Sequence, residues 1–195
     1  MELTLPLKLD LNHVHLTDEQ FYQLCINNPE WNIEQNAKGV LIVMSPVGGE
    51  SGKREANYII DLGIWNRQAQ LGEVFSSSTI FKLPKGGKRS PDAAWVEHSR
   101  WEALTPEQRK KFPPIAPDLV IELRSVTDDL ATLQEKMEEY LESGVRLGWL
   151  LNPQDQQVEI YRQGQEKEVR DLPTLLSGEA VLSGFELNVD RFTDD

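Results

Sequence analysis

Apolar strand candidates and helix candidates are mixed along this chain, and that mixture restricts its fold more than any other feature of the sequence. The segment 119–123, Leu-Val-Ile-Glu-Leu, is the most apolar strand candidate up to that point. A strongly charged helix candidate, 127–143, follows it and ends at Gly144. Two more strands are expected at 145–151 and 158–161. Strands and helices mixed within 195 residues predict an α/β or α+β fold with a mixed β-sheet.

We expect residues 1–195 to form a single domain, of which residues 1–15 are an N-terminal extended arm, because apolar and polar residues partly alternate there. Thr17 and Gln20 have the spacing of a capping box, which predicts a helix that begins there. Segments 31–35 and 40–44 favour a β-hairpin. A second helix is expected from about Glu50, and five of its residues have the spacing of one buried stripe: Ala56, Ile59, Ile60, Gly63 and Ile64.

Composition excludes several classes of protein. Hydrophobic residues make up 39% of the chain, which is enough for a globular core. No apolar run is long enough to span a bilayer, and the N-terminus lacks the pattern of a signal peptide. Cys25 is the only cysteine, which excludes an internal disulfide framework and a multi-cysteine zinc site. We therefore expect a cytoplasmic protein without membrane partners.

The formal net charge of −12 disfavours non-specific binding of nucleic acid, because that affinity comes mainly from Lys and Arg meeting phosphates. The cations are unevenly spread, however, and the segment 82–89 contains four of them and no acid. Lys82, Lys85, Lys88 and Arg89 are therefore candidates for nucleic-acid contacts. Solvated loop charge explains the same segment equally well.

Glu122 and Arg124 are two residues apart on a strand candidate, so both side chains are expected on the same face. A metal-dependent phosphodiesterase needs carboxylates that share a divalent ion and a cation that stabilises charge on the phosphate. Mg²⁺ suits such a site because it takes few protein oxygens and keeps water and phosphate as its other ligands. An ion-paired strand end is the alternative interpretation of the two residues.

Two Pro-Asp pairs could supply the second carboxylate. Asp118 is four residues from Glu122 on the same strand candidate, roughly 13 Å away, which is too far to share one ion. Asp92 lies on a separate strand candidate, and strand pairing can bring it beside Glu122. We therefore choose Asp92 as the partner and interpret Asp118 as the residue that precedes its strand.

Pro91-Asp92, followed about thirty residues later by Glu122-x-Arg124, resembles the PD-(D/E)XK pattern of restriction-endonuclease-like nucleases. Further motifs surround this pair in order: Ser45-Pro46-x-Gly48-Gly49-Glu50-x-Gly52, Ser90-Pro91-Asp92 with Trp95-Val96, Pro117-Asp118-Leu119-Val120-Ile121-Glu122-x-x-Ser125, Lys136-x-x-x-Tyr140 with Gly144-Val145 and Trp149, and Val158-x-x-Tyr161. Together they resemble the Uma-two family of restriction endonucleases over roughly residues 15–190.

The resemblance implies a restriction-endonuclease-like core, in which helices flank a mixed sheet and metal-binding carboxylates lie at adjacent strand ends. It also implies an Mg²⁺- or Mn²⁺-dependent endonuclease that hydrolyses DNA phosphodiester bonds and assembles as a homodimer. Glu50 matches the acidic residue that many members of the superfamily add to the metal site. An acid favoured by the helix dipole explains Glu50 equally well.

The sequence departs from the superfamily pattern at Arg124, where the motif has Lys. Arg stays charged and cannot act as a base, although it can hold a phosphate bidentately. The resemblance makes Lys136 a candidate for a migrated catalytic lysine, and an ordinary surface lysine is the alternative. The departure also leaves a second function open: a catalytically inactive nuclease fold that binds nucleic acid or protein.

Overall fold

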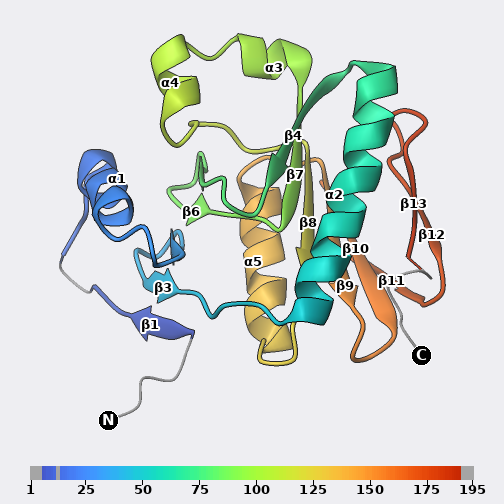
Figure 1. The fold of residues 1–195 in the computed structure, drawn as a ribbon, viewed down its shortest axis with the longest axis horizontal. Coiled ribbons are helices and arrows are strands. Elements are labelled where there is room, and N and C mark those ends of the chain that lie inside the picture. Colours follow the sequence, from blue (N-terminus) through green and yellow to red (C-terminus); the bar gives the residue numbers. More distant parts are fainter. Residues whose placement is uncertain (1–5, 12–13, 190–195) are drawn as a thin grey trace.

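The computed structural model describes residues 6–11 and 14–189, which form sheets of six, five and two strands with helices packed around them (Figure 1). The helices are α1 (Asp18–Asn27), α2 (Gly49–Ala69), α3 (His98–Glu102), α4 (Pro106–Lys110) and α5 (Leu130–Glu142). The strands are β1 (Leu7–Leu9), β2 (Ile33–Gln35), β3 (Leu41–Val43), β4 (Gly72–Ser76), β5 (Phe81–Lys82), β6 (Lys88–Arg89), β7 (Ala93–Glu97), β8 (Leu119–Leu123), β9 (Leu147–Asn152), β10 (Gln157–Arg162), β11 (Glu168–Asp171), β12 (Leu175–Ser177) and β13 (Glu186–Asn188). Within the described part of the chain, no helix has both the length and the apolar composition that crossing a membrane requires.

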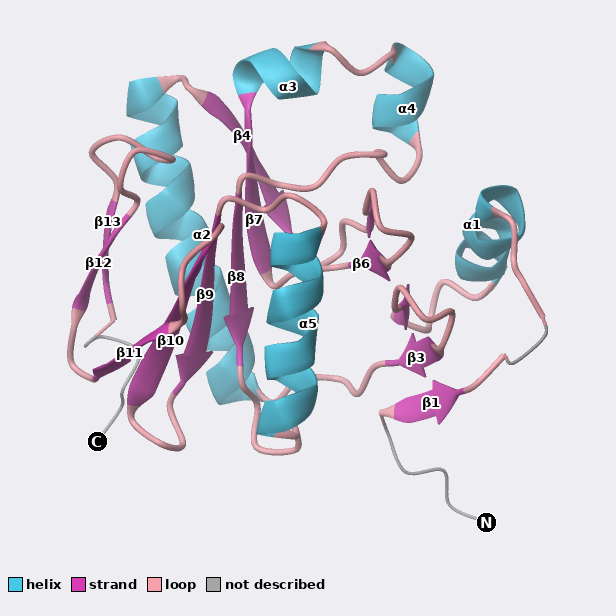
Figure 2. Ribbon diagram, turned by 180° about the vertical axis from the view of Figure 1, so that it is seen from behind, coloured by secondary structure: helices cyan, strands magenta, loops and turns pink. Residues whose placement is uncertain are grey.

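The six-stranded sheet has the order β11-β10-β9-β8-β7-β4. Its neighbouring strands are antiparallel except β8 and β9, which pair in parallel because α5 forms the crossover between them. Helix α2 and the β12–β13 hairpin pack on one face of this sheet, and α5 packs on the other (Figure 2). The predicted fold class, a mixed sheet flanked by helices, is confirmed.

All five residues of β8 are buried, because both faces of the central sheet are covered. Leu119 and Ile121 face the α2 side, whereas Val120 packs with α5. By the alternation of a strand, Glu122 also faces α5. This explains why a carboxylate interrupts an apolar run: it is directed at the helix that follows the strand.

The five-stranded sheet, in the order β1-β3-β2-β6-β5, lies beside α5 and α1 in both views (Figures 1 and 2). It contains the predicted hairpin, here β2 and β3. The predicted capping box is also present, with the Gln20 backbone N–H donating to the Thr17 hydroxyl at 3.2 Å. Residues 7–9 of the predicted arm pair with β3, and residues 1–5 and 12–13 are outside the described residues.

The predicted buried stripe of α2 is mostly wrong, although Ile59 does pack against the core. Ile60 and Ile64 are 54% and 50% exposed, whereas Tyr58 and Leu62 are fully buried and Trp65 packs against the same core. Residues 58, 62 and 65 also have helical spacing, so the periodicity alone allowed both faces. The face with the two aromatic side chains is the buried one, because aromatic rings remove more apolar area from water.

Candidate active site

Asp92 and Glu122 come together through the antiparallel pairing of β7 and β8. The register pairs Ala93 with Ile121, and continuing it by one residue places Asp92 opposite Glu122. The backbone N–H of Leu123 donates to Asp92 Oδ2 at 2.7 Å, which holds this side chain against the end of β8. Both carboxyl groups line a pocket of about 340 Å³.

Asp118 lies at the opposite end of β8, as its interpretation as the residue before that strand requires. Its side chain is fully buried, accepts a hydrogen bond from the backbone N–H of Glu97 at 2.8 Å, and pairs with Arg100 at 2.7 Å. Asp118 does not line the pocket of Asp92 and Glu122. Asp92 and Asp118 therefore join β7 and β8 by hydrogen bonds at opposite ends of these two strands.

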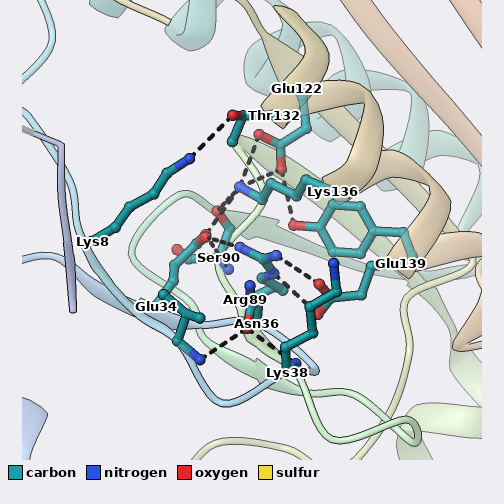
Figure 3. Close-up of polar contacts among 12 residues, drawn as sticks. Lys8, Glu34, Asn36, Lys38, Arg89, Ser90, Glu122, Thr132, Lys136 and Glu139 are labelled. Carbon is teal, nitrogen blue, oxygen red and sulfur yellow. Dashed lines mark hydrogen bonds and ion pairs between the residues drawn. The ribbon is translucent and has the colours of Figure 1, made fainter. Parts of the chain in front are cut away.

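Lys136 on α5 is buried and is directed at Glu122 (Figure 3). Its Nζ lies 2.8 Å from Glu122 Oε1 and 3.0 Å from Glu122 Oε2. Tyr140 follows one turn later on the same face of the helix and donates its hydroxyl to Glu122 Oε1 at 2.9 Å. The interpretation of Lys136 as an ordinary surface lysine is therefore wrong.

Glu34 is a buried member of this cluster that the sequence analysis did not single out. It comes from β2, and its Oε1 lies 3.0 Å from Lys136 Nζ and accepts the backbone N–H of Ser90 at 2.9 Å. Its Oε2 accepts from Arg89 at 3.0 Å, and Arg89 is also held by two hydrogen bonds to Glu139. No local pattern marks Glu34, because its role depends on how the five-stranded sheet packs beside α5.

The electrostatics of the pocket favour a bound cation. Burial raises the pKa of Asp92 well above its ordinary value, and the charge of Glu122 raises it further. Burial also raises the pKa of Glu122, even though Lys136 beside it favours the carboxylate. Burial alone would lower the pKa of Lys136, but the carboxylates of Glu122 and Glu34 outweigh it and raise the pKa. Lys136 is therefore an ammonium group at neutral pH.

The donor set fits a magnesium ion that takes few protein ligands. Among the residues that the structure describes, no group of three or more His, Cys, Asp or Glu side chains is placed to hold a metal. Asp92 and Glu122 can supply two oxygens, and Mg²⁺ is commonly bound through one or two carboxylates, with water and substrate phosphate completing its shell. A closed site of four protein ligands, as structural zinc requires, is not available from these residues.

Glu50 is not brought to the pocket. Its side chain is 68% exposed and lies 3.8 Å from Lys53 in the first turn of α2. Glu55 from the same helix lines the pocket instead, accepts a hydrogen bond from the Ser77 hydroxyl, and raises the pKa of Asp92. Five residues correspond to a rotation of about 140° on a helix, so Glu50 and Glu55 point in different directions.

Arg124 is not in the pocket either. Its guanidinium donates to Asp155 in the turn between β9 and β10 at 2.9 Å and to the side chain of Asn152 at the end of β9 at 3.2 Å. The strand ends at Leu123, so the alternation that places residues 122 and 124 on one face does not extend to Arg124. The cation beside Glu122 is Lys136.

The basic segment 82–89 is largely engaged with acids of the protein itself. Lys82 and Lys88 both pair with Asp18 of α1, and Lys88 is buried and donates to Gln35 at 2.8 Å. Arg89 is buried between its two glutamate partners. Lys85, in the turn between β5 and β6, is exposed. These pairings attach α1, β2 and α5 to the segment, so most of its cations have a structural role.

The chain matches a family model, Uma2, described as "Putative restriction endonuclease", over residues 18–190. It is also similar to a crystal structure from Anabaena variabilis ATCC 29413, described as a "putative nuclease belonging to DUF820". The TM-score is 0.70 with 21% sequence identity, and the match covers 84% of this chain and 90% of the other. At that identity the likeness shows the fold alone. No curated protein matches the chain.

Proposed function

The chain belongs to the Uma2 family of restriction endonucleases, and from this premise we propose that it is an Mg²⁺- or Mn²⁺-dependent endonuclease that hydrolyses DNA phosphodiester bonds. One observation carries the proposal: Asp92, directly before β7, and Glu122 of the adjacent strand β8 line one pocket, with the ammonium group of Lys136 at 2.8 Å from Glu122. Two carboxylates and a lysine in this relation are what metal-assisted phosphodiester hydrolysis needs.

In this proposal Asp92 and Glu122 would hold the ion. A divalent ion bound there would lower the pKa of water and neutralise charge on the phosphate. Lys136 donates hydrogen bonds to a phosphate oxygen and stabilises the charge that develops on it. Against the effect of burial, Glu122 and Glu34 raise the pKa of Lys136, which supports this cationic role. Tyr140 keeps the Glu122 carboxylate in place through its hydroxyl.

Glu55 takes the place of Glu50 in the proposal. It lines the pocket, is held by the Ser77 hydroxyl, and is close enough to affect the pKa of Asp92. It is therefore the acidic residue of α2 that can add to the site. Arg124 is given no part in the reaction, because Asp155 and Asn152 hold its guanidinium outside the pocket.

Plasmid nicking tests the proposal. The purified protein should nick supercoiled plasmid DNA with Mg²⁺ or Mn²⁺, and Asp92→Asn should not. Asn suits this test because the raised pKa of Asp92 indicates that the site accepts a neutral side chain. Lys136→Met should slow cleavage by about 10²- to 10³-fold, the usual effect of losing one group that stabilises the transition state. Glu50→Gln is the control and should cleave normally, and equal nicking by wild type and Asp92→Asn would refute the assignment.

The second candidate function is a catalytically inactive module that binds nucleic acid or protein. The net charge of −12 and the internal pairing of Lys82, Lys88 and Arg89 favour the protein-binding form of this module, since both reduce the attraction of a long nucleic acid. This candidate predicts that calorimetric titration with Mg²⁺ or Mn²⁺ gives no heat that depends on Asp92 and Glu122.

A homodimer is also part of the proposal. What supports it is an exposed apolar face on α2, where Ile60 and Ile64 border the edge strand β4. An exposed apolar face beside a sheet edge is a feature of association surfaces. The mass of the protein in solution, compared with that of Ile60→Lys, tests whether this face joins two copies.

A further inference from the structure

The pocket around Asp92 and Glu122 is strongly acidic. Among the described residues that line it there is one cation, Lys136, which is already bound to Glu122 and Glu34. Its acidic residues are Glu30, Glu34, Glu55, Asp92, Glu122 and Asp128. Duplex DNA is bound mainly through phosphate contacts to Lys and Arg along its backbone. The lining of this pocket does not offer such contacts.

Two of the four cations of the neighbouring basic segment do not compensate for this deficit. Lys88 and Arg89 are buried and engaged with Gln35, Glu34 and Glu139, and therefore cannot follow a phosphate backbone. A divalent ion on Asp92 and Glu122 would neutralise the phosphate at the reacting centre only. The substrate therefore needs a source of affinity that does not depend on rows of cations.

An apolar part of the same lining supplies such a source. It consists of Pro6, Trp31, Met44, Pro46 and Val47, and Trp31 and Val47 are 43% and 56% exposed. Large apolar side chains that stay exposed within a polar pocket indicate a binding function. Residues 45–47 belong to the Ser-Pro-x-Gly-Gly motif, and the proposed metal site gives this motif no role.

Trp31 is held in a defined position at the start of the hairpin that also carries Glu34. The Trp31 backbone N–H donates to Asn28 at 3.0 Å, and the Met44 N–H donates to Asn32 at 2.9 Å, which extends the β2–β3 hairpin by one residue pair. The backbone of Trp31 is therefore held two residues before β2, the strand whose Glu34 contacts Lys136. A ligand group stacked on Trp31 would be placed relative to the reacting centre by the β2 strand.

We propose that the substrate is single-stranded DNA, and that an unpaired base beside the scissile phosphate stacks on Trp31. The proposal rests on the proposed nuclease function and names its substrate class. Stacking on an aromatic ring adds affinity beyond that of the phosphate contacts and tolerates any base. A pocket of about 340 Å³ is at the small end of sites for single small molecules, so it suits one unpaired nucleotide. An unpaired strand also avoids the cost of extruding a base from a duplex.

Binding of fluorescently labelled DNA, measured by anisotropy with Ca²⁺ in place of Mg²⁺, tests the proposal without cleavage. A single-stranded oligonucleotide should bind at least about tenfold more tightly than the same sequence as a duplex, because only the strand offers an unpaired base to stack. Trp31→Ala should weaken strand binding by about tenfold, and Trp31→Phe should retain most of the affinity. Ile26→Ala is the control, because Ile26 is an exposed apolar residue on α1 that does not line the pocket.

The outcomes separate this proposal from the proposed function. The proposal is overturned if single-stranded and duplex DNA bind with equal affinity, or if Trp31→Ala binds single-stranded DNA as tightly as the wild type. Either result counts even if the wild type nicks plasmid. Binding of single-stranded DNA that requires Trp31 supports the proposal even if no cleavage is found. The nuclease function is then decided by cleavage assays alone. Trp31 is exposed, so its variants should melt at the wild-type temperature. If Trp31→Ala does not fold, the comparison of single-stranded and duplex DNA on the wild type still tests the proposal.

Discussion

At the scale of single residues, Glu34 and Glu122 share one ammonium group. Lys136 Nζ lies 3.0 Å from Glu34 and 2.8 Å from Glu122, and all three side chains are buried. Such a pair offsets its desolvation only when further hydrogen bonds satisfy the remaining atoms. Arg89 and the Ser90 backbone N–H do this for Glu34, and Tyr140 does it for Glu122. The position of the candidate catalytic lysine therefore depends on a glutamate from another sheet.

Glu34→Gln should destabilise the protein at neutral pH by about 3 kcal/mol, because Lys136 and Arg89 each lose one buried anionic partner. Burial by itself would raise the pKa of Glu34, but Lys136 and Arg89 outweigh it and lower the pKa. The charge of Glu34 therefore stabilises the fold above the ordinary pKa of Glu, and this stabilisation is lost as the pH falls through the lowered pKa.

Urea unfolding of wild type and Glu34→Gln from pH 7 to pH 3 measures this difference. The gap in unfolding free energy should be largest at neutral pH and should narrow at the acidic end of the series. Glu30→Gln is the matched control: Glu30 lines the same pocket but is exposed, so its effect should be small at every pH. A gap that widens on acidification would contradict the assigned direction of the pKa shift.

At the scale of elements, α5 and the turn between β5 and β6 fit each other closely. A Cβ added at Gly87 would lie 1.9 Å from Glu139 Oε1, the oxygen that accepts from Arg89 Nε at 3.1 Å. Glycine at position 87 therefore leaves room for the carboxylate that joins α5 to β6. The same helix presents Lys136 to Glu122, so one element connects the β6 strand with the candidate active site.

Gly87→Ala should displace Glu139 from Arg89 and destabilise the fold by about 1–3 kcal/mol, the usual cost of overpacking a filled position. Thermal unfolding followed by circular dichroism measures the change. Gly49→Ala is the control, because an added Cβ there meets nothing within 4 Å at the exposed start of α2. If the two variants had the same melting temperature, the close packing at Gly87 would not contribute to the stability of the fold.

At the scale of the whole molecule, the candidate site lies where two sheets meet at α5. The central sheet supplies Glu122, with Asp92 directly before its strand β7. The five-stranded sheet supplies Glu34, and α5 supplies Lys136, both of which lie near Glu122 in Figure 3. A ligand bound at this junction stabilises the folded state in proportion to its affinity, because the unfolded chain does not hold these groups together.

Mg²⁺ or Mn²⁺ should therefore raise the melting temperature of the wild type. At a hundred times the dissociation constant, the expected stabilisation is about 2.7 kcal/mol. Asp92→Asn should show little of this increase, whereas Glu50→Gln should show all of it, because Glu50 does not line the pocket. Differential scanning calorimetry of the three proteins decides between the nuclease and the inactive module, since the inactive module predicts no metal-dependent shift.

Local patterns were sufficient for the parts of the fold that neighbouring residues determine. The apolar run of β8, the capping box at Thr17 and the β2–β3 hairpin follow from side-chain alternation and hydrogen bonds within a few residues. The spacing along β8 also excluded Asp118 as the partner of Glu122 before any pairing was known. The choice of Asp92 as that partner rested on the same strand geometry.

Only the tertiary structure decided which side chains surround Glu122. The sequence pattern directed attention to Arg124 and Glu50, but a strand end and a helix rotation turn both away from the pocket. Glu34 and Glu55 take part because of how a second sheet and α2 pack, which no short-range periodicity encodes. The sequence by itself determined that the carboxyl groups of Asp92 and Glu122 lie opposite each other, because the pairing of adjacent strands places them there. The tertiary packing decided the cation and the pocket walls, because their contacts join elements far apart in the chain.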